Sequence, residues 1–316
     1  MNQRKLIKLG NSSFAIALPK DWVDKSGLKK GENVFLEENG NGEIIIKPNP
    51  GNKSNNKEIN IEITGKEAST IKGEVRAAYI RGYSTFRISG ARDKAAKENL
   101  KKIFSEFLSF ELIDSNEKEI IAKDFFNMED ANITNFIRRM DNNIREIFDI
   151  ALEEVKKEKI SPAKLKEIEE IDRDVNKFYF LCSRIFMRGI DNPSVMTSLK
   201  TDGTKLFSEW WFAFNLEALA DGIKYLLRAV QKLEAKNIPL LAEVFLEIKD
   251  AHAKVMESFY KEDSQSSHQI IKTTQEIRDK LIKLEKEGII SQPISYELDS
   301  IRKQVYQNAK MSSYIK

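Results

Sequence analysis

The chain has 316 residues, of which 41% are hydrophobic and 32% charged, and it carries a formal net charge of +3. One hydrophobic core rarely organises a chain of this length, so we expect two or three domains. The sequence has no run of about 18 apolar residues and begins without the apolar segment of a secretory signal, so we expect neither membrane insertion nor export.

Cysteine and histidine are scarce in this sequence. Cys182 is the only cysteine, which excludes an intrachain disulfide and zinc sites built on cysteine. The two histidines, His252 and His268, leave little material for histidine-dependent metal or acid–base sites. With neither a disulfide nor an export signal, we expect a cytoplasmic protein.

The first 47 residues predict short strands joined by polar turns. The expected elements are strands at 4–9 and 14–18, a helix at 22–26, and a hairpin of strands 33–37 and 43–47. Asp21 is expected to cap the helix and Gly27 to end it. The Asn-Gly pairs of residues 38–42 favour the tight turn of the hairpin.

This segment resembles a known family. Its apolar strand ends in Leu18-Pro19-Lys20, and after the short helix comes Gly27-Leu28-Lys29-Lys30-Gly31-Glu32-Asn33-Val34. This order resembles the AbrB/SpoVT/MazE-like swapped-hairpin DNA-binding domains. The resemblance implies a β-barrel of two interleaved copies at residues 1–48, which binds DNA.

The physical properties of the segment favour the same interpretation. About 45 residues cannot bury enough surface alone, and a two-fold dimer would present two basic surfaces to a palindromic duplex. The candidate DNA-binding residues are Arg4, Lys5, Lys8, Asn11, Ser12, Ser13 and Lys20. The basic side chains could neutralise phosphates, and the polar ones could donate hydrogen bonds to phosphates or base edges. The alternative is a dimerisation module whose lysines are only solvated.

Two further regions follow. Residues 49–57 have the composition of a linker. Residues 58–125 predict strands and helices in the order βαβαββ, which is typical of a small α/β sandwich with helices over one sheet. With Ala77-Ala-Tyr-Ile-Arg-Gly-Tyr-Ser-Thr-Phe-Arg-Ile-Ser-Gly90, this segment is similar to the spacer domain of archaeal PhoU-type regulators, which join an AbrB-like N-terminus to a PhoU C-terminus.

From residue 126 to the end the pattern is helical throughout. Helices are expected at 129–159, 162–188, 194–236, 240–260, 264–286 and 294–312. The third of these helices should be broken near Asp202-Gly203. Six helices joined by short loops predict an antiparallel bundle or a pair of bundles.

Two acidic pairs lie within these helices. Glu170 and Asp174 share one helix face, as do Glu217 and Asp221, and antiparallel packing could bring the four carboxylates together. Oxygen ligands of this kind suit a divalent or iron-type metal cluster. The alternative is a pair of solvated faces, although Glu217 and Asp221 lie in an otherwise apolar segment.

The acidic pairs also carry a resemblance. Residues 169–181 and the segment Asn215-Leu-Glu-Ala-Leu-Ala-Asp-Gly222 resemble PhoU proteins, which are tandem three-helix bundles whose Glu/Asp-x-x-x-Asp motifs bind multinuclear metal clusters. The resemblance implies that Glu170, Asp174, Glu217 and Asp221 are ligands. The family's second motif is commonly followed by histidine, whereas this chain has Gly222, and its second repeat lacks both motifs.

The parts together lead to one hypothesis. We expect a homodimeric or higher-order transcriptional regulator of phosphate uptake that binds DNA through residues 1–48 and senses through residues 126–316. Phosphate transporter or sensor proteins are expected as further partners. The alternative is a signalling adaptor that docks on such a partner without binding DNA. We do not expect an enzyme, because the carboxylate pairs lack the Glu-x-x-His pattern of di-iron bundles and no nucleophile–base arrangement stands out.

Overall fold

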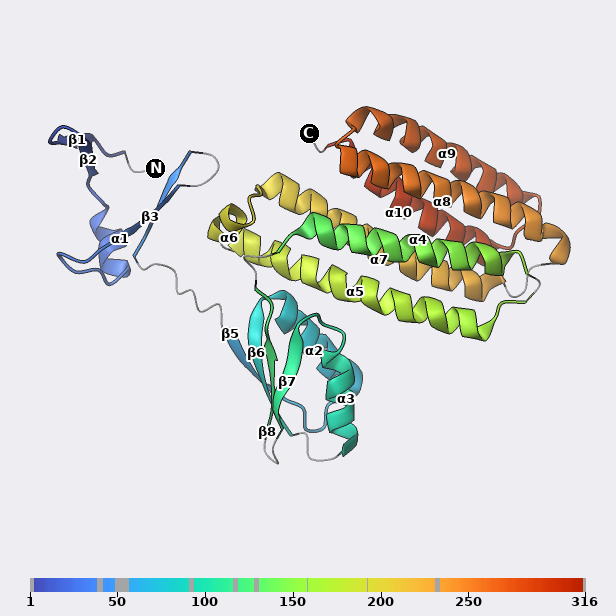
Figure 1. The fold of residues 1–316 in the computed structure, drawn as a ribbon, viewed down its shortest axis with the longest axis horizontal. Helices are drawn as coiled ribbons and strands as arrows, with labels where there is room; N and C mark the ends of the chain where they lie inside the picture. Colours follow the sequence, from blue (N-terminus) through green and yellow to red (C-terminus); the bar gives the residue numbers. More distant parts are fainter. Residues whose placement is uncertain are drawn as a thin grey trace. The chain divides into compact units, whose positions relative to one another are not determined.

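The computed structural model describes residues 3–38, 42–48, 57–90, 94–115, 119–127, 131–157, 159–191, 193–230 and 234–314. Its contacts divide the chain into two units, residues 1–55 and 56–316 (Figure 1). Most of the predicted linker at 49–57, and residues 39–41 of the predicted turn, lie outside the described residues. Lys57, the last residue of that linker, is the first residue of a strand.

The N-terminal unit consists of two small hairpins and one short helix. Its elements are β1 (Leu6–Leu9), β2 (Ser13–Ile16), α1 (Lys20–Lys25), β3 (Phe35–Glu38) and β4 (Ile44–Lys47). β1 pairs with β2 and β3 with β4, both antiparallel. Gly10, with φ of +68°, turns the chain between β1 and β2, where an L-residue with a side chain would be strained.

The helix α1 begins earlier than the sequence predicts. Pro19 is its N-cap, and Asp21, the expected cap, lies inside the first turn. Pro19 lacks an N–H and holds φ at −60°, so it suits the start of a helix without a capping side chain. The predicted end is confirmed, because Gly27 follows the helix with φ of +69°.

No described side chain of residues 3–48 is buried. The large hydrophobic residues left exposed in this unit are Leu6, Ile7, Leu9, Phe14, Ile16, Val34, Phe35, Leu36 and Ile44. Full burial of one such side chain stabilises a fold by about 1.5–3 kcal/mol, so the unit on its own forgoes its main source of stability.

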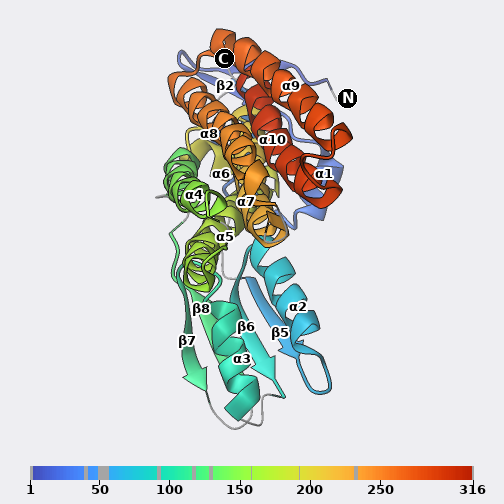
Figure 2. The same cartoon turned by 90° about the vertical axis from the view of Figure 1, so that its right-hand side faces the viewer.

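The second unit begins with a four-stranded mixed sheet. Its elements are β5 (Lys57–Glu62), α2 (Ala68–Ile80), β6 (Tyr83–Ser89), α3 (Lys94–Phe104), β7 (Phe110–Ser115) and β8 (Glu119–Asp124). The strand order is β5-β6-β8-β7, in which β5 and β6 are parallel and the other neighbours are antiparallel. Both helices cover the same face of the sheet (Figures 1 and 2). The order of strands and helices along the chain confirms the predicted βαβαββ order.

Helices make up the remainder of the described chain. They are α4 (Ile133–Val155), α5 (Pro162–Asp191), α6 (Pro193–Ser198), α7 (Gly203–Ala229), α8 (Ile238–Lys261), α9 (Ser264–Lys286) and α10 (Gln292–Ser312), with a 3-10 turn at Ala235–Asn237. The predicted break near Asp202-Gly203 is confirmed, and the Asp202 side chain caps α7 by accepting a hydrogen bond from the Lys205 backbone N–H. None of the helices in the described residues is long and apolar enough to cross a membrane.

The long helices pack in two sets of three. α4, α5 and α7 contact one another, as do α8, α9 and α10, and α7 lies along α10 between the sets. One continuous hydrophobic core runs through all six helices. A second core lies between the sheet and α2 and α3, and Phe180 of α5 enters it.

A buried arginine joins the sheet to the helices. Arg184 of α5 is 1% exposed, and its Nη2 lies 2.7 Å from the Asp124 Oδ2 at the end of β8. Its Nη1 donates hydrogen bonds to the carbonyl oxygens of Tyr79 and Tyr83, at 3.0 and 2.8 Å. These carbonyls flank the turn between α2 and β6, so a single guanidinium connects α5 to two separate parts of the α/β region.

We expect Arg184→Met to lower the free energy of unfolding by about 3–5 kcal/mol, because Asp124 would be left buried without its counter-charge. The matched control is Arg228→Met, which breaks an exposed pair with Glu169 and should cost about 1 kcal/mol or less. Urea denaturation followed by circular dichroism measures both. Equal losses in the two variants would contradict the role assigned to Arg184.

Candidate functional site

The seven candidate DNA-binding residues lie on one hairpin and the start of one helix. Arg4, Lys5 and Lys8 precede or belong to β1, and Lys20 is the first residue of α1. Asn11 and Ser12 form the tip of the hairpin, and Ser13 is the first residue of β2. All seven side chains are exposed. The structure therefore leaves every one of them accessible to a ligand.

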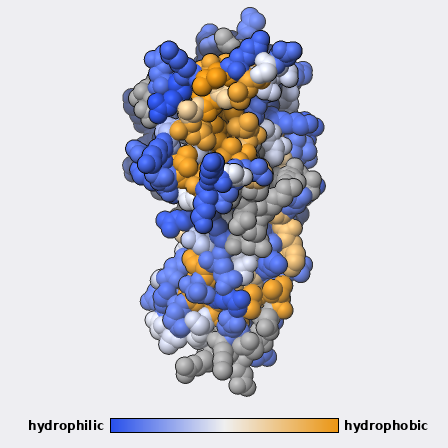
Figure 3. Space-filling view, turned by 90° about the vertical axis from the view of Figure 1, so that its left-hand side faces the viewer, coloured by the Kyte–Doolittle hydropathy of each residue, from blue (hydrophilic) through white to orange (hydrophobic). Residues whose placement is uncertain are grey.

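Apolar side chains occupy both faces of this hairpin. Leu6 lies opposite Ile16 and Ile7 opposite Ala15, and because side chains alternate along a strand these two pairs point to opposite faces. Figure 3 shows hydrophobic residues, in orange, gathered into a broad area on the face of the molecule that it presents. A hairpin with apolar side chains on both faces is stabilised only when other parts of a protein pack against both faces.

The four predicted metal ligands do not come together. Glu170 and Asp174 have side chains 54% and 56% exposed, and they pair along their own helix with Arg173 and Lys177. The acidic residue of this stretch that reaches α7 is Asp172, which is 4% exposed and pairs with Lys224. Two residues along a helix rotate the side chain by about 200°, so Asp172 lies on the face opposite Glu170 and Asp174. The expected convergence of these two with Glu217 and Asp221 was wrong.

An ion-paired cluster stands between the helices instead. It consists of Asp172 on α5 with Glu217, Asp221 and Lys224 on α7, and we call it the α5–α7 cluster. The Lys224 Nζ lies 2.5 Å from Asp172 Oδ2 and 2.6 Å from Asp221 Oδ1. Burial acts to lower the pKa of Lys224, but the hydrogen bonds with Asp172 and Asp221 raise it, so the ammonium keeps its charge.

Burial raises the pKa of Asp172, and the Lys224 ammonium offsets part of this effect. Burial also raises the pKa of Glu217 to about 7, and the neighbouring charges of Asp221 and Asp172 add to the shift. The Glu217 carboxyl has no hydrogen bond or ion pair among the described residues. It is therefore the part of the cluster whose charge changes near neutral pH.

These residues do not fit the metal site that the PhoU resemblance implies. The Lys224 ammonium bridges two of the three carboxylates, at the point where a bridging cation would lie. Gly222 stands where the family commonly has histidine, and a Cβ built on it would lie 2.9 Å from Ile301 Cγ1 of α10, too close for any side chain. No group of three or more His, Cys, Asp or Glu side chains in the described part of the chain is arranged to hold a metal ion.

The sequence contained a signal for Asp172 that the acidic spacing alone does not reveal. Ile168, Asp172 and Val175 are all buried and follow the i, i+4, i+7 spacing of one helix face. A carboxylate on an apolar stripe requires a buried partner. Lys224 lies on the same face of α7 as Glu217 and Asp221. The same spacing rule therefore identifies Lys224 as the candidate partner of Asp172.

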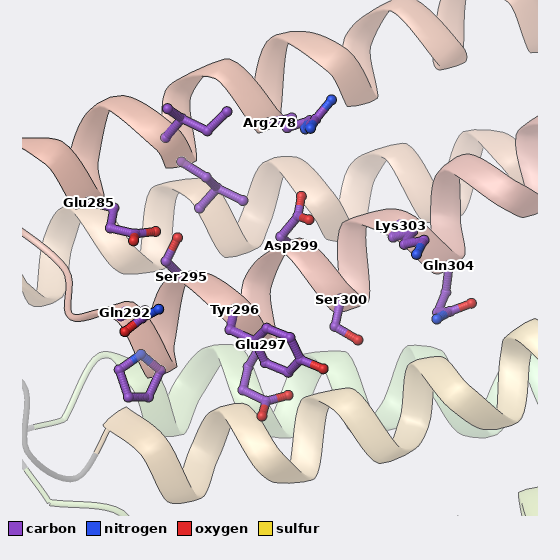
Figure 4. Close-up of a pocket in the computed structure, with 13 residues that line it drawn as sticks. Arg278, Glu285, Gln292, Ser295, Tyr296, Glu297, Asp299, Ser300, Lys303 and Gln304 are labelled. Atoms are coloured by element: carbon purple, nitrogen blue, oxygen red, sulfur yellow. The ribbon is translucent and has the colours of Figure 1, made fainter.

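A groove of about 770 Å³ lies between α9 and α10 (Figure 4). Its wall includes the cationic Arg278 and Lys303 and the carboxylates of Glu285, Glu297 and Asp299. None of the predicted DNA-binding or metal-ligating residues lines it. Side chains of both charges line the groove, so no single class of charged ligand matches it.

The comparisons with known proteins bear on the N-terminal unit. Residues 7–54 match the family described as antidote-toxin recognition MazE, a bacterial antitoxin. No curated protein matches the chain. No solved structure matches it either. The N-terminal unit is thus MazE/AbrB-like, and the long helical region that follows matches no family that the comparisons name.

The raised pKa of Glu217 predicts a pH dependence of stability. Between pH 4.5 and about 7 the folded protein holds a proton that the unfolded chain releases, so this group lowers the free energy of unfolding as the pH rises. Glu217→Gln cannot ionise. We expect it to be more stable than the native protein at pH 8, by on the order of 1–3 kcal/mol, and equally stable near pH 4.5.

Thermal unfolding at pH 4.5, 6 and 8 measures this difference. Glu170→Gln is the matched control, because its side chain is 54% exposed and its removal should leave the pH dependence unchanged. A Glu217→Gln protein that is less stable than the native chain at pH 8 would show that the ionised carboxylate stabilises the fold.

Proposed function

We propose that the chain is a homodimeric DNA-binding transcriptional regulator of phosphate uptake, and that its N-terminal hairpins interleave with those of a second copy. In this proposal the dimeric hairpins form a swapped barrel that binds a palindromic operator. The helical region, proposed to be a PhoU-like pair of three-helix bundles, receives the phosphate signal. The protein acts by binding and not by catalysis.

The observation that carries the proposal is the missing core of the N-terminal unit. Its two hairpins expose large hydrophobic side chains, and none of its described residues is buried. A second copy of the same unit supplies a matching apolar surface through a two-fold axis, as isologous dimers do. The likeness of residues 7–54 to MazE antitoxins supports the same association.

Charge supports the DNA-binding part. Residues 1–30 contain seven lysines and arginines against Asp21 and Asp24. A dimer doubles this excess and places it on two symmetric surfaces, which is the arrangement that the phosphates of a duplex attract. Asn11 and Ser12 at the hairpin tip are polar and exposed, so they can reach base edges or phosphates.

The phosphate part rests on resemblance and on helix packing. Residues 169–181 and 215–222 resemble PhoU proteins, and the helices pack as two sets of three. The signal in this proposal reaches the helical region through a protein partner or a small anion. We propose a phosphate transporter or sensor component as this partner. In the alternative adaptor function, the helical region would dock on the same partner without DNA binding.

We expect Phe14→Asp combined with Leu36→Asp to convert the dimer to monomers. These side chains are 62% and 65% exposed in the single unit, and pairing would bury them, so a charge at either position opposes association. Analytical ultracentrifugation of the full chain measures the mass. Phe125→Asp, at a similarly exposed position of the second unit, is the control and should leave the mass unchanged. A double variant that stays dimeric would place the dimer contacts elsewhere.

We expect Arg4→Ala, Lys8→Ala and Lys20→Ala together to weaken binding to DNA by roughly 100-fold or more. Each cationic side chain that no longer neutralises a phosphate should also make the slope of log K against log salt shallower by about 0.9. Fluorescence anisotropy with fragments of phosphate-transporter promoters and with random DNA measures affinity and preference. The control removes the same charge from α9, by Lys272→Ala, Lys283→Ala and Lys286→Ala.

Three outcomes discriminate between the functions. Preference for the promoter fragments, abolished in the N-terminal triple variant alone, supports the proposed regulator. Binding that both triple variants weaken equally reflects net charge only. Absence of DNA binding by the native dimer, together with capture of a transporter component, favours the adaptor.

A further inference from the structure

We propose that the ammonium of Lys224 is the resident cation of the α5–α7 cluster, so that the native chain binds no metal ion there, and that neutralising this lysine creates a site for one divalent cation. All residues of the cluster belong to the helical region. The inference therefore holds whether or not the N-terminal unit binds DNA.

The ammonium of Lys224 occupies the position that a bridging cation would need. Its Nζ lies 2.5 and 2.6 Å from oxygens of two carboxylates that belong to different helices. These are direct charge-assisted contacts, and they place a positive charge where a bridging Mn²⁺ or Ca²⁺ would bind. The side chain of Lys224 is only 13% exposed, so the ammonium is held inside the cluster and does not sample solvent freely.

The cluster also retains unused oxygen ligands. Asp172 Oδ1 is buried and has no hydrogen-bond partner, and the side chain that carries it is only 6% exposed. Glu217 lies within Coulomb range of Asp172 and Asp221 and has no partner of its own in the described part of the chain. Without Lys224, Asp172 and Asp221 would lose their shared ion pair, and the cationic charge left acting on Glu217 would be that of Arg76. A hard divalent cation is the ligand that carboxylate oxygens of this kind prefer.

The packing around Gly222 disfavours a side-chain ligand at that position. The 2.9 Å approach of Ile301 to the Cβ position of Gly222 leaves no room for an additional ligand after Asp221. The side-chain ligands that the cluster offers to a cation are therefore the carboxylates of Asp172, Glu217 and Asp221. Lys224, a residue of the same helix, supplies the positive charge to two of these carboxylates.

The test compares Mn²⁺ binding by full-length variants, followed by loss of the electron paramagnetic resonance signal of free Mn²⁺. We expect the native protein to leave the signal unchanged, as should Lys224→Arg, which keeps the charge. Lys224→Ala and Lys224→Gln should each bind about one Mn²⁺ per chain. Adding Asp221→Asn to Lys224→Ala should abolish that binding.

Lys177→Ala is the matched control. Lys177 also pairs with a carboxylate three residues away on a helix, at 2.9 Å from Asp174, but Asp174 is 56% exposed. This variant should gain no Mn²⁺ site, because the solvated carboxylates of Glu170 and Asp174 are not gathered against a second helix.

Stoichiometric binding by the native protein would overturn the proposal, and so would the failure of both neutral variants to bind. Circular dichroism reports whether each variant is folded. A neutral variant that unfolds without metal and refolds with Mn²⁺ supports the proposal. One that Mn²⁺ does not refold counts as a failure to bind.

Discussion

The behaviour of the whole molecule depends on hydrophobic surface that the N-terminal unit cannot bury by itself. Ordering a residue costs roughly 1–2 kcal/mol of backbone entropy, and burial of apolar side chains is the main term that offsets it. Residues 3–48 bury no described side chain, so their order requires a partner surface. Covering of this surface therefore comes before any function of the unit, and the proposed second copy is the partner that would supply it.

The second unit, in contrast, has two hydrophobic cores of its own, and these must be held together. Arg184 does this between the end of α2 and the start of β6, where its guanidinium donates hydrogen bonds to the backbone carbonyls of Tyr79 and Tyr83. Asp124 completes the neutralisation of the guanidinium. A buried ion pair of this kind contributes less to stability than well-packed hydrophobic residues would, but it admits one geometry only. It thereby fixes the orientation of the sheet on α5.

The sequence was sufficient for the order and type of the elements and insufficient for the choice between neighbouring polar residues. Apolar periodicity and turn residues predicted the βαβαββ region, the break at Asp202 and the end of α1 at Gly27. The start of α1 failed because a proline supplied the helix geometry that a capping aspartate was expected to supply. The acidic site failed because the spacing rule that joins Glu170 to Asp174 says nothing about which helix face is buried, whereas the apolar residues around Asp172 do.

The α5–α7 cluster shows why a motif and a site differ. Glu217 and Asp221 keep the spacing of a metal-binding motif, yet the residues around them serve helix packing and ion pairing. Close packing of α7 on α10 requires glycine at 222, and the charge that the carboxylates need comes from Lys224, a residue of the same helix. A covalently attached cation cannot dissociate, so stability of this interface is independent of metal supply. Within the cluster, Glu217 is the carboxyl without a hydrogen bond or ion pair among the described residues, and burial together with the charges of Asp221 and Asp172 raises its pKa to about 7.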